Sequence, residues 1–299
     1  MEMKSFDEIV VRAKGTTEKR TVAVVWATDD HSQDAVFRAA DDGLLDFLFI
    51  GDPDRIKAVA SGLGRDVSDA QICVAADPAA AALAGAQVIQ SGRAHFLMKG
   101  KIETGEFLRP VVRRENGVSP ENGVMSHIAL NAIPRYRKLL LTTDGGMLPY
   151  PDKAQKIAIL ENAVRVMRGL GYAKPKVCLL AAVEKVNPKM PETVDAAEIC
   201  ELYRDADHCV VEGPISLDLA LVRERSVQKG YESPCAGDAD VLIVPNIHAG
   251  NILGKSLVEL AGGHMAGLVM GAKCPIVLTS RGSSAAEKFN ALALACAIC

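Results

Sequence analysis

Short apolar runs alternate with longer amphipathic segments along the chain, and this alternation constrains the fold more than any other feature. Helical patterns separate the runs; in the clearest, Asp152–Gly169, Ile157, Leu160 and Val164 recur on one face. Such alternation predicts an α/β fold built from strand–helix units around parallel sheets. The expected strands are Thr21–Trp26, Leu45–Ile50, Gln71–Ala75, His95–Met98, Lys138–Thr143, Lys176–Val183, His208–Val211, Asp240–Asn246 and Pro275–Thr279.

Nine strands in 299 residues predict two α/β domains, each able to bury a core. The segment Arg113–Pro134 is rich in Arg, Glu, Asn, Gly and Pro and has no strong period, so we expect it to cross between the domains. The strand–helix pair after Gly271 is compatible with either domain, and we assign it to the first. The predicted domains are residues 1–130 with 271–299, and residues 131–270.

Composition excludes several classes of function. The net charge of −3 provides no basic field, so we expect no nucleic-acid partner. The longest uncharged stretch, Pro78–Gly92, falls short of the roughly 20 residues of a membrane-spanning helix. Because the N-terminus also lacks the apolar core of a signal peptide, we expect a cytoplasmic protein that does not bind membranes.

The eight cysteines and six histidines do not form a metal-binding pattern. Most cysteines lie far apart inside apolar runs, as is typical of reduced thiols packed as small hydrophobic side chains. The one close pair, Cys296 and Cys299, has the spacing of one helical face and lacks a second pair to complete a zinc site. We therefore expect no bound metal.

Polar residues and glycines follow five of the predicted strands, where open α/β sheets bind their ligands. The most suggestive group is Ser280 with Arg281, whose guanidinium can hold a phosphate or carboxylate, just before a helix start at Ser284. An ordinary strand–turn–helix with Ser284 as N-cap explains the same residues. The other four groups contain Lys99, Gly100 and Thr104; Asp144 and two glycines; Glu212 and Asp218; and Asn246, Gly250, Asn251 and Lys255.

Each of the other groups also has a purely structural interpretation, such as a solvated basic loop at Lys99 or a plain Asp-Gly turn at Asp144. Five such strand ends together nevertheless favour one shared ligand cleft. Gly254-Lys255-Ser256 is close to a phosphate-binding P-loop, but Ala249 replaces its first glycine. No nucleophile elbow accompanies Ser126 and His127, so a catalytic triad has no support.

Taken together, these motifs resemble the phosphate acetyl/butyryl transferase family along almost the whole chain. The motifs that match in order and spacing are Lys99-Gly100, Met125-Ser126-His127, Thr143-Asp144, Val186-Asn-Pro-Lys-Met-Pro191, Glu212-Gly-Pro214 with Asp218, Val244-Pro-Asn246 through Gly250-Asn251 and Lys255, and Thr279-Ser280-Arg281. The Asn187–Pro191 run and the chain length are most like the butyryl branch.

The resemblance implies an isocitrate-dehydrogenase-like fold of two α/β domains flanking a cleft, and a metal-free transfer of a short acyl group between coenzyme A and inorganic phosphate. Coenzyme A, acyl-CoA and acyl phosphate are then substrates, and no cofactor is tightly bound. The butyryl group is the expected acyl group, with acetyl as the alternative. A homo-oligomer, dimeric or larger, is expected for this fold.

The resemblance also implies roles for individual residues. Arg281 grips the acyl phosphate, Ser280 orients the thiol or the carbonyl, and Glu287 matches the position of a proposed general base in the acetyl branch. Further substrate-binding residues are Lys99, Gly100, Thr104, Ser126, His127, Asp144, Asp218, Asn246, Gly250, Asn251 and Lys255.

One departure concerns the base. The butyryl branch has an Asp soon after its Ser-Arg pair, whereas this chain has Ser283 there and carries its carboxylate on Glu287. The run from Ser284 to Glu287 also has the spacing of a capping box, which is the favoured interpretation of Glu287. Two other functions remain as alternatives: a P-loop nucleotide hydrolase or kinase, and a non-catalytic acyl-CoA-binding protein.

Overall fold

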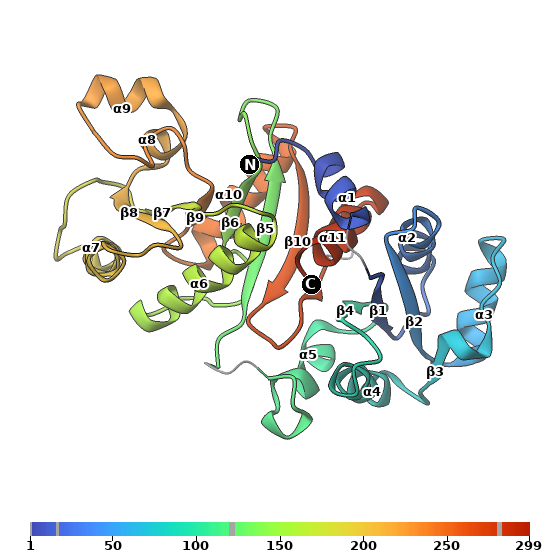
Figure 1. Cartoon of the computed structure of the whole chain (residues 1–299). Coiled ribbons are helices and arrows are strands. Elements are labelled where there is room, and N and C mark those ends of the chain that lie inside the picture. The colour runs from blue at the N-terminus through green and yellow to red at the C-terminus, as the bar shows by residue number, and fades with distance from the viewer. Residues whose placement is uncertain (1, 16–17, 120–122, 280–282) are drawn as a thin grey trace. The chain divides into compact units, whose positions relative to one another are not determined.

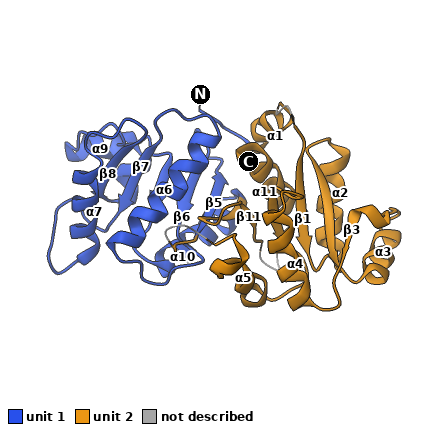
Figure 2. Cartoon of the chain, turned by 60° about the horizontal axis from the view of Figure 1, so that its bottom comes forward, with its two compact units in different colours: residues 1–5, 126–265 blue, residues 6–125, 266–299 orange. Residues whose placement is uncertain are grey.

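The structure is a computed structural model that describes residues 2–15, 18–119, 123–279 and 283–299. The chain divides into two compact units, shown in blue and orange in Figure 2. Unit 1 comprises the N-terminal residues up to 5 with 126–265, and unit 2 comprises residues 6–125 with 266–299. The predicted boundaries at 130 and 270 thus differ from unit boundaries at 125 and 265, and the first five residues group with unit 1.

Unit 2 contains a mainly parallel sheet with strand order β3-β2-β1-β4-β11-β10 (Figure 1). The exception is β11, which pairs antiparallel with β10; the unit boundary crosses β10. The elements are α1 Phe6–Lys14, β1 Arg20–Val25, α2 Asp30–Asp41, β2 Leu45–Gly51, α3 Pro53–Gly62, β3 Ile72–Val74, α4 Pro78–Gln90, β4 Phe96–Lys99, α5 Thr104–Val112, β10 His264–Met270, β11 Ile276–Val277 and α11 Ala285–Ile298.

Crossover handedness places the helices of unit 2 on both faces of its sheet. The chain moves outward from β1 to β3 and then returns past β1 to β4. Because parallel crossovers are right-handed, α2 and α3 cover one face and α4 covers the other. Close packing of α4 requires Gly85, where a Cβ atom would come within 2.7 Å of the Val25 side chain.

Unit 1 contains strands in the order β5-β6-β9-β7-β8 (Figure 1). The strands β6, β9, β7 and β8 run parallel, and β5 pairs antiparallel with β6. The elements are β5 Ser126–Ala132, β6 Leu140–Thr143, α6 Lys153–Gly169, β7 Lys176–Leu180, α7 Pro191–Leu202, β8 Val210–Ile215, α8 Leu217–Leu221, α9 Arg223–Lys229, β9 Val241–Ile243 and α10 Ile247–Glu259.

Two strands were missed by the sequence patterns. The segment expected to be a featureless crossing contains β5, because Ser126 and Asn131 disguise a strand whose Ile128 and Leu130 are fully buried. Asn131 is tolerated there because its amide donates to the carbonyls of Ala129 and Leu140. The second missed strand is β10.

Charged residues bind the amino ends of three unit 1 strands together. Lys138, 1% exposed, contacts Asp240 and lies 2.7 Å from Asp238, while the Lys176 ammonium also pairs with Asp238. Burial alone would lower the pKa of Lys138, but hydrogen bonds to the two carboxylates outweigh it and raise that pKa. Glu2 joins the same cluster through Lys138, which explains why the first residues group with unit 1.

Replacing Lys138 with methionine should lower the free energy of unfolding by roughly 3–5 kcal/mol, because Asp240 would be left buried without its partner. Urea denaturation at neutral pH measures the loss. The matched control is Lys57→Met, which breaks an ion pair to Asp69 with both side chains largely exposed and should cost about 1 kcal/mol or less. Equal small losses in both variants would contradict a structural role for the cluster.

Candidate active site

The carboxyl ends of four parallel strands meet at one edge of unit 1. The register pairs Thr143 of β6 with Ile243 of β9, and Ile243 with Leu179 of β7. Residues that follow β6 and β9 therefore lie side by side, as expected for a ligand-binding edge. Two of the sequence-predicted groups, at Asp144 and at Asn246, are brought together in this way.

Asp144 organises the loop that follows β6. Its carboxylate is 2% exposed and accepts hydrogen bonds from three successive backbone amides: Gly146 at 2.8 Å, Met147 at 2.9 Å and Leu148 at 3.1 Å. Three donors offset the cost of burying the carboxylate and fix the loop in one conformation. In this structure, Asp144 thus shapes the loop.

Two glycines let this loop touch the start of helix α10. A Cβ atom on Gly250 would lie 2.7 Å from the Asp144 carbonyl oxygen and 2.8 Å from the Gly145 Cα. Asn246 caps the helix by accepting from the Ala249 amide at 3.1 Å, and Asn251 donates to the Gly145 carbonyl at 3.3 Å. The Asp144 loop and the start of α10 are therefore packed directly against each other at the carboxyl edge of the sheet.

Helix α10 presents a polar exposed face beside this loop. His248, Asn251 and Lys255 are exposed and recur at the spacing of one helical face. The His248 ring nitrogen lies 3.1 Å from the hydroxyl of Tyr150, which is 71% exposed at the end of the Asp144 loop. Sequence reasoning did not single out His248 and Tyr150, since neither belongs to a recognisable motif.

The same helix rules out the P-loop interpretation. A P-loop places its Gly-Lys-Ser at the end of a glycine-rich loop, where backbone amides surround a phosphate. Here Gly254, Lys255 and Ser256 lie well inside α10, which begins at Ile247. Backbone amides within a helix are already paired along the helix, so this segment cannot surround a phosphate.

His127 and Ser126 are neighbours in β5 but differ in burial and in the residues that they contact. The Ser126 side chain is fully buried and accepts a hydrogen bond from the Asn162 amide at 3.0 Å. His127 is half-buried, and a Cβ atom on Gly146 would lie 3.1 Å from its ring. Burial lowers the pKa of His127, although the charge of Asp144 opposes this, and the lowered pKa favours the neutral imidazole.

Unit 2 carries the other predicted group at its own strand edge. Lys99 ends β4 and donates to the carbonyls of Gly100 and Ile102, and Thr104 is exposed at the start of α5. Gly100 is required by packing, since a Cβ atom there would lie 2.5 Å from the Trp26 carbonyl oxygen.

The Ser-Arg pair follows a neighbouring strand of the same unit. Because β4 and β11 are parallel neighbours, the chain leaves β11 at the edge where Lys99 lies. Ser280 and Arg281 themselves lie outside the described residues.

Glu287 forms the capping box that its spacing predicts. Its carboxylate accepts from the Ser284 amide at 2.9 Å, and the Ser284 hydroxyl accepts from the Glu287 amide at 3.1 Å. At the start of α11, Ser284 is exposed and Glu287 is half-buried. The structural interpretation of Glu287 is confirmed, and its role as a general base stays a prediction.

Asp218 lies away from the Asp144 loop. It lies in the first turn of the short helix α8 after β8, accepts from the Ser216 hydroxyl at 2.6 Å and pairs with Lys229 at 3.2 Å. Within the described ranges, no three His, Cys, Asp or Glu side chains are placed as metal ligands would be. None of the helices there has the length and apolar character needed to cross a bilayer.

Comparison with known proteins identifies the family of this chain. The sequence model of the family described as phosphate acetyl/butaryl transferase matches residues 79–296. The chain belongs to this family. The family resemblance drawn from the strand-end motifs is thereby confirmed.

Individual relatives cover nearly the whole chain. Phosphate butyryltransferase of Clostridium acetobutylicum is 38% identical over 98% of this chain and 97% of its own length. Phosphate acetyltransferase of Thermotoga maritima is 36% identical over 96% and 97%. The crystal structure of a branched-chain phosphotransacylase from Enterococcus faecalis, 33% identical, superposes with a TM-score of 0.82 over 93% of this chain and 98% of that one. The predicted α/β fold class is confirmed.

The contact between the two glycines can be tested directly in this transferase. Replacing Gly250 with alanine should lower turnover about tenfold or more, because the methyl group would push the Asp144 loop away from α10. It should also cost roughly 1–3 kcal/mol of stability. Gly254→Ala in the same helix is the control, since no atom lies within 4 Å of its Cβ position; it should be neutral or stabilise by about 1 kcal/mol. Similar behaviour of both variants would refute the contact's importance.

Glu287→Gln separates the cap from the base, since glutamine can complete a capping box but cannot accept a proton from a thiol. We expect little loss of stability and retention of most turnover. A base would instead lose about 100- to 10,000-fold in turnover, with the loss shrinking as pH rises and the thiol ionises unaided. Thermal unfolding and a pH profile of kcat distinguish the two results.

Proposed function

We propose that this protein is an acyltransferase that moves a butyryl-type acyl group between coenzyme A and inorganic phosphate. The observation that carries the proposal is the 38% identity with a phosphate butyryltransferase over almost the full length of both chains. The structural likeness to a branched-chain phosphotransacylase favours the same acyl class. Coenzyme A acts as a substrate, and no tightly bound cofactor is needed.

The proposed reaction in the thiolysis direction has three parts. The coenzyme A thiol loses its proton to a base, and the sulfur forms a bond to the carbonyl carbon of the acyl phosphate. The tetrahedral intermediate places a negative charge on the former carbonyl oxygen, which requires hydrogen-bond donors. The bond between carbon and the phosphate oxygen then breaks, leaving acyl-CoA and inorganic phosphate.

The proposed residues divide these tasks. Arg281 holds the phosphate and Ser280 orients the thiol or carbonyl, and Lys99 at the end of β4 is a second cation of unit 2. On unit 1, Asn251 and Lys255 face solvent from α10 and are available to a substrate, while Asp144 and Gly250 fix the position of that helix. The neutral imidazole of His127 offers a further acceptor or donor.

A phosphate acetyltransferase is the second candidate, favoured by the Thermotoga maritima relative at 36% identity. The two differ only in the length of the acyl chain that the site accepts. A pocket that accommodates two further methylene groups gains about 0.8 kcal/mol for each one buried. Relative kcat/KM across acyl lengths therefore decides between them.

We also propose a cytoplasmic homo-oligomer. None of the eight cysteines forms a disulfide in the structure, as is usual in a reducing compartment. Ile252 on α10 and Leu260 directly after it are 66% and 85% exposed, which favours a partner subunit covering part of this helix.

Phosphate-dependent release of free thiol from acyl-CoA tests the proposed function. We expect turnover with butyryl-CoA at a kcat/KM about tenfold above that with acetyl-CoA, since two buried methylene groups contribute about 1.6 kcal/mol. We also expect no change on adding EDTA. A preference for acetyl-CoA would favour the second candidate, and binding of acyl-CoA without any turnover would indicate a non-catalytic protein.

A further inference from the structure

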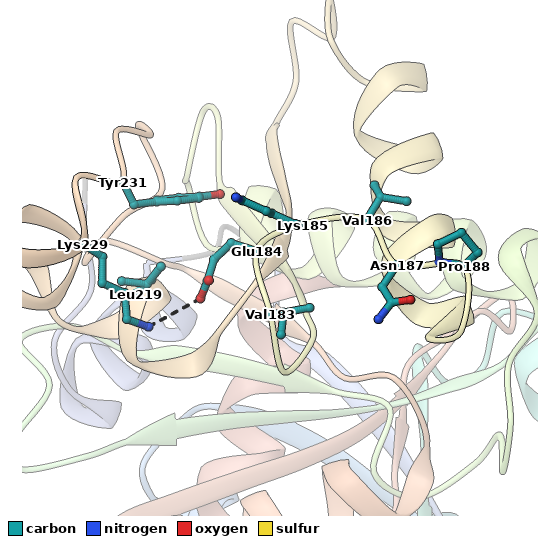
Figure 3. A pocket seen from close by; sticks show the side chains of 9 residues that line it. All are labelled: Val183, Glu184, Lys185, Val186, Asn187, Pro188, Leu219, Lys229 and Tyr231. Carbon is teal, nitrogen blue, oxygen red and sulfur yellow. Dashed lines mark ion pairs between the residues drawn. The ribbon is translucent and has the colours of Figure 1, made fainter.

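A pocket of about 610 Å³ lies within unit 1, apart from the Asp144 loop. One wall is the loop of residues 183–188 that follows β7, and the other is built from Leu219, Lys229 and Tyr231, which follow β8. Figure 3 shows Tyr231, Lys229 and Leu219 at one end and Val186, Asn187 and Pro188 at the other. No predicted site residue lines it.

The pocket opens at the same strand edge as the Asp144 loop and α10. Strands β6, β9, β7 and β8 are parallel and adjacent in this order, so the segments after all four share one edge. Neighbouring strands are about 4.8 Å apart, which puts the end of β8 roughly 10 Å from the end of β9. A long ligand bound at α10 can therefore reach the pocket along this edge.

The lining combines an aromatic ring with apolar side chains and one amide. The Tyr231 hydroxyl donates to Glu212 at 2.8 Å, so its polar group is occupied and its ring remains as a flat apolar surface. Val183 and Leu219 supply further apolar surface. The Asn187 oxygen accepts from the Lys189 backbone amide at 3.0 Å, which leaves its NH2 group to point at a ligand acceptor. Aromatic stacking with an amide donor suits a purine base.

The pocket lining contains two lysines, Lys185 and Lys229, which differ in their partners. Glu184 accepts from the Ser216 hydroxyl and lies 3.6 Å from the Lys229 ammonium, which also pairs with Asp218. Lys185 is exposed on the pocket rim and forms no ion pair with any residue that the structure describes. A phosphate group is the ligand chemistry that such a lysine suits.

We propose that this pocket binds the phosphoadenosine end of coenzyme A, with the adenine ring against Tyr231 and a phosphate at Lys185. The pantetheine arm then runs along the strand edge toward α10 and delivers the thiol to the Asp144 loop. The proposal rests on the proposed acyl transfer, for which coenzyme A is the substrate.

The test compares two thioesters that differ only at the far end, butyryl-CoA and butyryl-pantetheine. In Lys185→Ala, the KM for butyryl-CoA should rise several-fold while kcat stays unchanged, because the lost contact is the same in ground and transition states. The KM for butyryl-pantetheine should not change. In Tyr231→Leu, the KM for butyryl-CoA should rise about tenfold, as expected for a lost base-stacking contact.

Two control variants accompany this comparison. Lys174→Ala removes the same charge just before β7, at the opposite end of that strand, and should leave both KM values unchanged. Tyr231→Phe keeps the ring but loses the hydrogen bond to Glu212, so any effect of that bond on folding is seen separately. If Tyr231→Leu fails to fold, Lys185→Ala still tests the proposal, because Lys185 is exposed.

Equal changes for both thioesters, or no change for either, would overturn the proposal. A free adenine nucleotide could occupy the same pocket as an effector. Phosphoadenosine diphosphate is the probe: competitive inhibition against butyryl-CoA, lost in Lys185→Ala, supports the substrate site, and inhibition that does not compete overturns it. If neither thioester reacts in the unmodified protein, the proposed function itself fails, which is a different result.

Discussion

The parallel pairing of β6, β9, β7 and β8 is the constraint on which the rest of unit 1 depends. The carboxyl ends of parallel strands lie at one edge of the sheet, so the loops that follow these strands all lie at that edge. The Asp144 loop, the start of α10 and the wall of the pocket at Tyr231 are three consequences of this single arrangement. These segments therefore lie at one edge of the sheet of unit 1.

The two edges of this sheet are used for different purposes. At the amino ends, Lys138, Asp238 and Asp240 join strands through buried charges that compensate one another. At the carboxyl ends, charges such as Lys185 and Lys255 remain exposed and open to a ligand. A buried charge pair has its binding capacity occupied by its partner, whereas an exposed cation retains its capacity to bind an anion.

Backbone contacts that leave no room for a Cβ atom set the geometry of the candidate site. Gly145 and Gly250 touch because neither has a Cβ atom, and the buried Asp144 carboxylate then holds the loop in that position through backbone amides. Residues that seem suited to chemistry can thus be structural. Glu287 caps a helix, and Ser126 satisfies Asn162 in the interior.

The sequence by itself determined the α/β class, the family and the capping box at Ser284, because periodicity and local spacing are properties of neighbouring residues. It did not reveal β5, whose polar residues Ser126 and Asn131 find buried partners on α6 and β6. Only the tertiary structure decided which strand ends adjoin and that Tyr231 lines a pocket. Those outcomes depend on strand order, which no local pattern encodes.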